Sequence, residues 1–586
     1  MGLEIAARRR LLSGNAAIAR GAYEAGVAFA AGYPGTPSTE ILENIASYPE
    51  IDCHWAANEK VAFDEAMGVA IAGKRALVAM KHVGLNVAAD SFMVFPYSGT
   101  VGGFVVITAD DPGMHSSQNE QDNRYFAKFA KVPLLEPADA REAKDFVIAA
   151  FELSEAFQTP VLLRTTMRLA HTKCVVELGE RKEPPPREFN RVIPDWVVPV
   201  FSRRLRPRLD ARLLRLAEFA EDFPYHREEA GDGEIGVLAS GVAYHYAREV
   251  LPGAGFLKLA MTYPLPRRKV LEFCRRYRTV YVVEETEPFL EEQVRLIGVT
   301  NIVGKDRLPA SGELSPEAVE MAVRGTAPPA DLSGEIAIPP RPPMLCAGCP
   351  HRGVFYALNR LKLLVAGDIG CYTLGCLPPL SALHTTFCMG ASIGNALGFG
   401  KAGIRDAVAV IGDSTFIHAG IPALIDVVYN KGTTTVVILD NRTTGMTGHQ
   451  HHPGTGRTLR GEPTHRLDLQ GLVRAVGVEF VLEVDPYDLK ATRQAIKEAV
   501  EHPGPAVVIT NRPCVLIPEE KAKVRQPYRV LAENCNGCGI CYRLGCPAVL
   551  QGPVADIDRF SCTGCSLCQQ VCPHRAIVLP EEEAKK

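Results

Sequence analysis

Two cysteine runs near the C-terminus carry the strongest chemical signal in the sequence. The first has the pattern C-x2-C-x2-C-x4-C-P and the second has the pattern C-x2-C-x2-C-x3-C-P. Three thiolates at this spacing let one tight loop hold three corners of a cubane cluster, and the more distant fourth cysteine reaches across to the other cluster. This crossover predicts two [4Fe–4S] clusters, one bound by Cys535, Cys538, Cys541 and Cys572 and the other by Cys562, Cys565, Cys568 and Cys546.

Zinc is the alternative metal for these cysteines, because x2 spacing also suits a tetrahedral zinc site. Zinc sites normally use two pairs of cysteines, whereas each run here is a triplet followed by Cys-Pro, which favours iron–sulfur clusters. The extra residue before Cys546 removes no ligand. The cysteine runs by themselves indicate electron transfer and leave open which reaction supplies the electrons.

Polar residues also follow two apolar segments in the third quarter of the chain. Gly412-Asp413-Ser414 follows a strand expected at 407–411, and Asp440-Asn441 follows a strand expected at 435–439. The carboxyl ends of neighbouring parallel strands meet at one edge of a sheet, where Asp413 and Asn441 can hold Mg²⁺ through oxygen ligands. A Gly-Asp turn alone is a weak signal, since such turns are common. The asparagine at the matching strand end strengthens it.

The loop after Asn441 is rich in glycine, and its backbone N–H groups, including those at Gly445, Met446 and Thr447, can close over a diphosphate. The same loop contains three histidines at 449, 451 and 452. Their spacing fits no common transition-metal site, so a polar active-site loop is the better interpretation.

The elements that position these residues form several domains, because 586 residues are too many for one hydrophobic core. Apolar runs that alternate with amphipathic segments predict three α/β units at 1–175, 231–330 and 345–525. A connector rich in Arg, Pro and Glu is expected at 176–230, and a Pro-rich linker at 331–344. The Cys-rich module at 526–586 is small enough to need a metal for stability.

Composition excludes several classes of protein. The formal net charge of -3 argues against a nucleic-acid binder, which usually has a strong basic excess. The longest apolar stretches are the length of strands and too short to cross a bilayer, and the N-terminus lacks the apolar core of a secretory signal. We therefore expect a cytoplasmic protein, in which seventeen cysteines favour metal ligation over disulfides.

The motif around Asp413 and Asn441 resembles the magnesium–diphosphate site of thiamine-diphosphate enzymes, with Ser414 where the family usually has glycine. With the cysteine runs, it is similar to the 2-oxoacid:ferredoxin oxidoreductases. The resemblance implies a multidomain α/β fold: parallel-sheet domains that bind pyrimidine (1–175) and diphosphate (345–525), a transketolase C-terminal-like domain (231–330), and a C-terminal two-cluster ferredoxin-like α+β domain. It also implies that Asp413, Asn441 and the Thr443 carbonyl bind Mg²⁺, with Gly412 and Ser414 near the cofactor.

A third cluster is implied by the resemblance. The segment Cys346-Ala-Gly-Cys349-Pro-His351 matches the family's C-x-G-C-x-H opening, and Cys371 and Cys514 match its later I-G-C and P-C elements. These four cysteines would bind the [4Fe–4S] cluster nearest the thiamine, with His351 at the cofactor. Spacing alone favours a mixture of buried and free cysteines, which is the ordinary fate of scattered residues of this type.

The N-terminal domain contains the expected catalytic acid. Glu59 lies in Asn-Glu-Lys-Val, which resembles the N-E-x-x-A element whose glutamate contacts N1′ of the thiamine aminopyrimidine and activates the cofactor. The alternative is a glutamate that only stabilises a helix N-terminus. Thr36, in a Y-P-x-T-P-S-like loop, would contact the oxoacid, although a Pro-bracketed turn explains it too. His384 would approach the cofactor, or serve as a structural histidine.

The substrate is expected to be bulky. Relatives that act on small oxoacids use an Arg after the fourth strand to bind the carboxylate, whereas this chain has Ala109-Asp110 there, and the following H-S-S-Q-N-E-Q-D pattern resembles the indolepyruvate enzymes. The resemblance implies oxidative decarboxylation of aryl 2-oxoacids with coenzyme A, electron transfer to ferredoxin, and a hetero-oligomer with a smaller β-subunit. A phenylglyoxylate or other sister oxidoreductase, a non-oxidative decarboxylase and a pure electron-transfer subunit are the alternatives.

Overall fold

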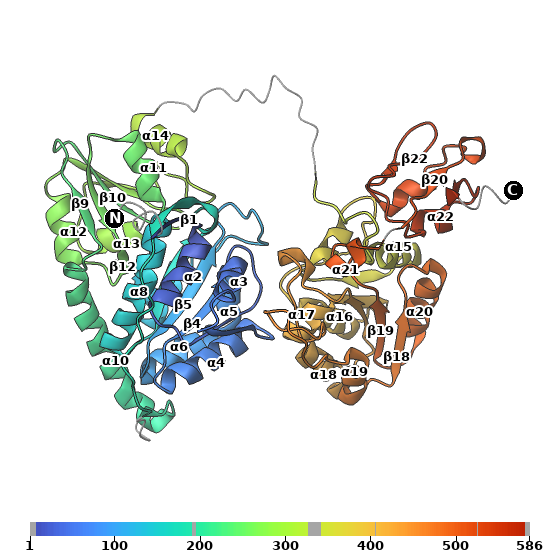
Figure 1. The fold of residues 1–586 in the computed structure, drawn as a ribbon, viewed down its shortest axis with the longest axis horizontal. Coiled ribbons are helices and arrows are strands. Elements are labelled where there is room, and N and C mark those ends of the chain that lie inside the picture. Colours follow the sequence, from blue (N-terminus) through green and yellow to red (C-terminus); the bar gives the residue numbers. More distant parts are fainter. Residues whose placement is uncertain (1–7, 190–194, 326–341, 405, 524, 581–586) are drawn as a thin grey trace. The chain divides into compact units, whose positions relative to one another are not determined.

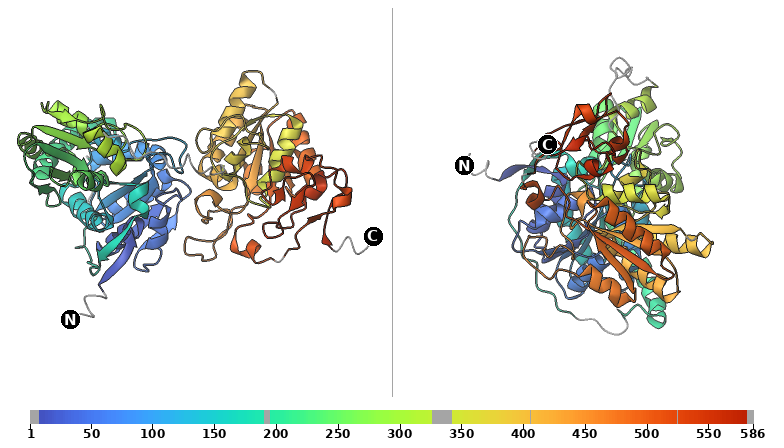
Figure 2. Two further views of the ribbon diagram at one scale, coloured as in Figure 1. Left: turned by 90° about the horizontal axis from the view of Figure 1, so that it is seen from above. Right: turned by 90° about the vertical axis from the view of Figure 1, so that its right-hand side faces the viewer.

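The computed structural model describes residues 8–189, 195–325, 342–404, 406–523 and 525–580. The chain divides into two compact units, Met1–Ala337 and Ile338–Lys586, which are described separately (Figures 1 and 2). Most of the Pro-rich linker predicted at 331–344 lies outside the described residues. Within the described ranges, every helix is too short or too polar to cross a membrane.

The first unit is built on a seven-stranded sheet with the strand order β12-β6-β7-β5-β4-β2-β3. Its long central strands are buried along their whole length, as expected for a parallel sheet with both faces covered. The apolar runs at 76–80 and 104–108 lie in β4 and β5. The seven strands are β2 (Phe29–Gly32), β3 (Asp52–Trp55), β4 (Ala76–Lys81), β5 (Phe104–Asp110), β6 (Leu134–Leu135), β7 (Val161–Thr166) and β12 (Met261–Tyr263).

Helices connect and cover these strands. They are α2 (Gly14–Glu24), α3 (Thr39–Ile45), α4 (Glu59–Ile71), α5 (His82–Val87), α6 (Ala89–Ser98), α7 (Arg124–Ala130), α8 (Ala140–Phe157) and α9 (Met167–His171). A two-stranded antiparallel ribbon, β1 (Arg9–Ser13) with β8 (Lys173–Glu177), lies beside them. A cluster of phenylalanines that includes Phe63, Phe95 and Phe104 packs edge to face in the core between α4, α6 and β5.

A five-stranded sheet with the order β14-β13-β10-β11-β9 completes the first unit. It consists of β9 (Arg227–Glu229), β10 (Ile235–Ser240), β11 (Gly255–Leu259), β13 (Thr279–Val283) and β14 (Ile302–Val303), with α11 (Ala243–Val250), α12 (Arg267–Cys274), α13 (Phe289–Leu296) and α14 (Pro316–Arg324). Strand β12, which follows β11 in the sequence, does not join this sheet. It pairs with β6 of the seven-stranded sheet and so links the two sheets. Residues 176–230, expected to be a connector, contain the long helix α10 (Pro199–Glu221). The many exposed arginines of α10 weaken the apolar periodicity by which a helix is recognised in a sequence.

The second unit contains a five-stranded parallel sheet with the order β15-β16-β17-β19-β18. The strands are β15 (Leu364–Ala366), β16 (Ala407–Gly412), β17 (Thr435–Asp440), β18 (Phe480–Val484) and β19 (Ala506–Asn511). The strands predicted at 407–411 and 435–439 are confirmed as β16 and β17. The helices are α15 (His351–Leu361), α16 (Ala391–Lys401), α17 (Asp413–Thr415), α18 (Ile421–Tyr429), α19 (Leu469–Val476), α20 (Leu489–Glu501) and α21 (Pro518–Lys521). Short turns η3 (Cys371–Cys376), η4 (Phe416–Gly420) and η5 (Gly445–Thr447) line its carboxyl edge.

The Cys-rich module packs on this domain within the same unit (Figure 1, red). It has two short antiparallel ribbons, β20 (Arg529–Val530) with β23 (Ile577–Val578) and β21 (Val549–Leu550) with β22 (Asp556–Ile557), together with η6 (Ala532–Asn534), η7 (Ile540–Leu544) and α22 (Leu567–Val571). Its buried side chains are few and include the cysteines themselves. Such a small core is consistent with a module that metal clusters stabilise.

Candidate functional site

The predicted magnesium ligands meet at the carboxyl edge of the second unit's sheet. Asp413, directly after β16, is 2 % exposed, and its carboxylate accepts hydrogen bonds from the backbone N–H groups of Ser414 and Arg442, both at 2.8 Å. Asn441, directly after β17, lies with its Nδ2 3.3 Å from His351 Nε2, and its Oδ1 accepts from Thr443 N at 3.3 Å. The donor set is therefore oxygen-rich, which suits Mg²⁺.

Two further residues at this edge, His452 and Asp440, were given no ligand role from the sequence. His452 is buried, and its Nε2 lies 3.2 Å from Asp413 Oδ2. Asp440 faces Asp413, and burial together with that neighbouring carboxylate raises the pKa of Asp440 to about 7. Sequence reasoning placed the histidine in a polar active-site loop but had no signal for this contact, which joins residues 39 positions apart.

The four cysteines of the proposed third cluster come together beside this edge. Cys346 and Cys349 precede α15, Cys371 begins η3, and Cys514 follows β19. Burial, with smaller contributions from Cys371 and Cys514, raises the pKa of Cys349 to about 12. Burial, with Cys514 and Cys346, raises that of Cys371 to about 11. A bound metal centre would replace the protons of these thiols, because a cation stabilises the thiolates.

The diphosphate loop touches this cysteine set. A Cβ at Gly445 would lie 3.4 Å from Cys371 Sγ, so the backbone of η5 packs directly on that sulfur. Tyr372, the next residue, packs on Gly412 at the end of β16. Met446 and Thr447 complete η5, and the Thr447 hydroxyl donates to Gln450 Oε1 at 2.6 Å. Any cluster at these cysteines would adjoin any diphosphate held by the loop.

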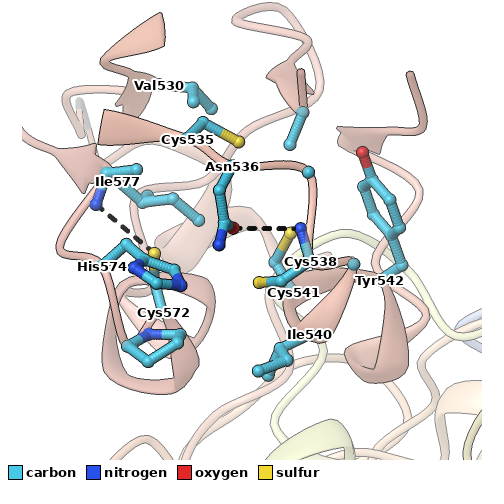
Figure 3. Close-up of a pocket in the computed structure, with 15 residues that line it drawn as sticks. Val530, Cys535, Asn536, Cys538, Ile540, Cys541, Tyr542, Cys572, His574 and Ile577 are labelled. Atoms are coloured by element: carbon cyan, nitrogen blue, oxygen red, sulfur yellow. Dashed lines mark hydrogen bonds between the residues drawn. The ribbon is translucent and has the colours of Figure 1, made fainter. Parts of the chain in front are cut away.

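The C-terminal cysteines separate into the two sets that the crossover predicts. Among the neighbours that raise the pKa of Cys541 after burial are Cys572, Cys535 and Cys538. Those that act on Cys568 are Cys565, Cys546 and Cys562. Figure 3 shows the first set around a small pocket, with the Asn536 side chain among the sulfurs. The Ala576 N–H donates to Cys572 Sγ at 3.3 Å, a contact that stabilises a cluster-bound thiolate.

Two sets of four cysteines suit two [4Fe–4S] clusters, each of which takes four thiolate ligands. Within the described ranges, no group of three or more His, Cys, Asp or Glu side chains is arranged around one ion position. All seventeen cysteines are free of disulfides.

In the first unit, the proposed acid Glu59 begins α4 after its capping residue. Asn58 accepts a hydrogen bond from Val61 N at 2.9 Å, the expected contact of a helix N-cap. The Glu59 side chain is 6 % exposed and packs against the backbone of Gly84 in α5, where a Cβ would lie 2.7 Å from Glu59 Oε1. A glycine at 84 therefore makes room for the carboxylate.

Thr36 lies in the loop after β2, at the same sheet edge. The Ser116 hydroxyl lies 3.4 Å from the Thr36 carbonyl oxygen, and the neighbouring Gly35 packs on Lys81 at the end of β4. Lys81 was not singled out in the sequence. It is 8 % exposed, its Nζ donates to the Ser116 carbonyl at 2.6 Å, and burial lowers its pKa to about 8 despite the nearby charge of Asp111.

The expected Arg position after the fourth strand is occupied by two buried residues, Ala109 and Asp110. Asp110 forms an ion pair with Arg164 at 2.6 Å, so its charge is balanced within the sheet. His384 is exposed in the second unit, and its Nδ1 accepts a hydrogen bond from Val365 N at 3.0 Å. This contact explains His384 structurally, and its role toward the cofactor stays a prediction.

Family models match three parts of the chain. "Pyruvate flavodoxin/ferredoxin oxidoreductase, thiamine diP-bdg" matches residues 20–193, "Thiamine pyrophosphate enzyme, C-terminal TPP binding domain" matches 368–510, and "4Fe-4S binding domain" matches 555–578. The chain therefore contains thiamine-diphosphate-binding domains and a [4Fe–4S] domain.

Curated relatives match nearly the whole chain. Indolepyruvate oxidoreductase subunit IorA of Archaeoglobus fulgidus is 43% identical, with 97% of this chain and 97% of the relative covered. The IorA subunit of Methanothermobacter thermautotrophicus is 44% identical, with 97% and 96% covered. A solved 2-oxoglutarate:ferredoxin oxidoreductase from Magnetococcus marinus is 16% identical over 54% of this chain and 65% of that chain, with a TM-score of 0.47, which carries no argument about the site. This chain belongs to the IorA family of indolepyruvate oxidoreductase subunits, within the thiamine-diphosphate-dependent 2-oxoacid:ferredoxin oxidoreductases.

Proposed function

We propose that this chain, with a smaller partner subunit, oxidatively decarboxylates aryl 2-oxoacids such as indolepyruvate. Coenzyme A receives the acyl group, CO₂ is released, and two electrons pass through three [4Fe–4S] clusters to a ferredoxin. The observation that carries the proposal is 43% identity to an IorA subunit over 97% of both chains. The direct packing of the diphosphate loop on Cys371 supports the proposal, because a cluster bound there would lie close enough to the cofactor to accept its electrons.

Bound thiamine diphosphate supplies a nucleophilic carbon that adds to the keto group and accepts the electron pair left by CO₂. Glu59 is proposed to hold a proton at N1′ of the aminopyrimidine, which promotes loss of the thiazolium C2 proton. Burial of its carboxyl group against Gly84 supports this role, since water is excluded and few positions remain open to the side chain. Glu59 is the first residue of a capped helix, so its backbone position is fixed.

Asp413, Asn441 and the Thr443 carbonyl are proposed to hold Mg²⁺ with the diphosphate. Their oxygen-rich donor set and shared sheet edge support this. His452 lies 3.2 Å from the Asp413 carboxylate and is proposed to orient it, as partners of metal ligands commonly do. His351, within 3.3 Å of Asn441 Nδ2, is proposed to act on the second ligand in the same way.

Lys81 is proposed to bind the carboxylate of the oxoacid. It is a buried cation at the end of β4, beside the loop that contains Thr36 and close to Gly84, against which Glu59 packs. The position where relatives carry an arginine lies at the end of β5 and holds Ala109 and Asp110 here. The nearby Arg164 is already paired with Asp110. An ammonium group forms a point-charge contact with a carboxylate and leaves room beyond it for an aromatic side chain.

The partners and the compartment are also proposals. The relatives are named as subunits, which supports a hetero-oligomer with a second chain. A cytoplasmic location suits twelve cluster cysteines that must stay reduced.

A panel of oxoacids tests the proposed substrate class. The complex with its partner subunit is assayed anaerobically with thiamine diphosphate, Mg²⁺, coenzyme A and a ferredoxin, and kcat/KM is compared for indolepyruvate, phenylpyruvate, phenylglyoxylate, pyruvate and 2-oxoglutarate. The proposal predicts the highest values for the two arylpyruvates. A preference for phenylglyoxylate would identify a sister enzyme, and CO₂ release without ferredoxin reduction would identify a non-oxidative decarboxylase.

A further inference from the structure

A fully buried arginine stands at the junction between the diphosphate domain and the Cys-rich module. Arg352, the second residue of α15, is 1 % exposed. Its Nη2 donates to the carbonyls of Leu345 at 2.6 Å and Cys346 at 3.0 Å, in the loop of the third cysteine set. Its Nη1 donates to the carbonyl of Leu544 at 2.5 Å, at the end of η7 in the Cys-rich module. The guanidinium group therefore binds both modules.

Arg352 has no acidic partner, which is unusual for a buried cation. Among the ion pairs between described residues, none includes this side chain, and its Nε–H has no hydrogen-bond partner there. An arginine stays charged in proteins, and a buried charge is costly unless another charge balances it. Carbonyl oxygens compensate part of this cost, but they carry no net charge.

The balancing charge is available in two neighbouring cysteine sets. Arg352 Nη2 binds the carbonyl of Cys346 in the third set. Its Nη1 would lie 3.4 Å from a Cβ at Gly545, directly before Cys546, which belongs to the middle set of Cys546, Cys562, Cys565 and Cys568. Tyr487 marks the same junction, since its hydroxyl donates to the Gly348 carbonyl and its own carbonyl accepts a hydrogen bond from Gln570 of the Cys-rich module at 2.7 Å. Thr563 packs directly on Gly348.

We infer that Arg352 is a shared counter-charge that raises the reduction potentials of the two clusters on either side of this junction. The inference rests on the proposed cluster ligation. A [4Fe–4S] cluster with four thiolates is anionic and gains one more negative charge on reduction. A fixed cation in a water-poor junction stabilises that reduced form, because cluster potentials respond to local charge and burial. Because both potentials rise together, both clusters become better acceptors for single electrons released at the cofactor.

The test is an EPR-monitored redox titration of the complex with its partner subunit, with iron content measured on the same samples. Arg352→Gln removes the charge and keeps an amide donor. It should shift two of the three cluster potentials downward by about 59 mV each, which is a tenfold change in a one-electron equilibrium, and leave the third unchanged. Arg352→Lys keeps the charge and should stay close to the unsubstituted protein. Arg543→Gln, at an exposed residue of η7, is the matched control and should shift none.

The outcomes separate cleanly. Unchanged potentials in Arg352→Gln with full iron would overturn the inference, and so would equal shifts in the Gln and Lys variants, which would make Arg352 a clamp between modules. Loss of iron in both variants alike would overturn the inference too, because the side chain would then be needed for cluster assembly and not for its charge. Failure of the cluster ligation itself would appear separately, as an unsubstituted complex without the iron of three clusters.

Discussion

Gly84 offers a way to displace the proposed catalytic acid without removing it. A Cβ at this position would lie 2.7 Å from Glu59 Oε1 and 2.8 Å from Glu59 Cγ, whereas ordinary contact begins at 3.4 Å. Gly84→Ala must therefore move the carboxyl group by about 0.7 Å. Because a displacement of about 1 Å in a catalytic geometry can cost a hundredfold in rate, we expect kcat/KM to fall on the order of 30-fold, or about 2 kcal/mol.

Stability should change little in this variant. Gly84 lies in helix α5 and does not require a positive φ, so alanine gains about 0.5–1 kcal/mol of helix propensity against the steric cost. The assays are kcat/KM for indolepyruvate and the exchange rate of the thiazolium C2 proton in the bound cofactor. Gly68→Ala is the control, since Gly68 lies in α4 with Glu59 and a Cβ there would meet nothing within 4 Å. Full activity and unchanged exchange in Gly84→Ala would refute the placement of the acid.

Three further predictions concern the substrate, the metal and the clusters. Lys81 is protonated below its pKa of about 8, so kcat/KM for the oxoacid should fall as pH rises through that value, and Lys81→Arg should remove this limb of the pH profile. A limb that persists in the variant would exclude Lys81. His452→Gln should raise the Mg²⁺ concentration for half-maximal activity by ten- to a hundredfold, whereas the exposed His465→Gln should not; equal effects would contradict the contact with Asp413. Cys514→Ser should reduce iron content by roughly a third, and full iron would exclude it as a ligand.

Elements with a strong local signal could be predicted from the sequence. The apolar runs at β4, β5, β16, β17 and β19 are buried along their length, which makes their strand character visible without knowledge of the fold. The grouping of the C-terminal cysteines followed from their spacing, because the geometry of a cubane constrains short loops. Helix α10 was missed because most of its residues are exposed and Pro207 interrupts its pattern.

The missed site residues depend on contacts between distant parts of the chain. Lys81 looks like an ordinary strand-end lysine until the loop at Gly35 and the carbonyl of Ser116 enclose it. Arg352 follows a cysteine motif, but its position between the two modules is visible only from its hydrogen bond to the carbonyl of Leu544, 192 residues later. Local propensity contains no information about such contacts, and a buried cation can be recognised only after the surrounding elements are in place.

The central claim is that an aryl 2-oxoacid delivers electrons to the iron–sulfur clusters of this chain. Its most direct test is anaerobic visible absorbance of the complex with its partner subunit, with and without thiamine diphosphate, Mg²⁺, coenzyme A and indolepyruvate. We expect bleaching of the cluster band that requires the oxoacid and the cofactor together and is lost in Glu59→Gln, whose iron content stays unchanged. A band that dithionite bleaches and indolepyruvate does not would contradict the aryl-oxoacid claim while leaving the clusters in place.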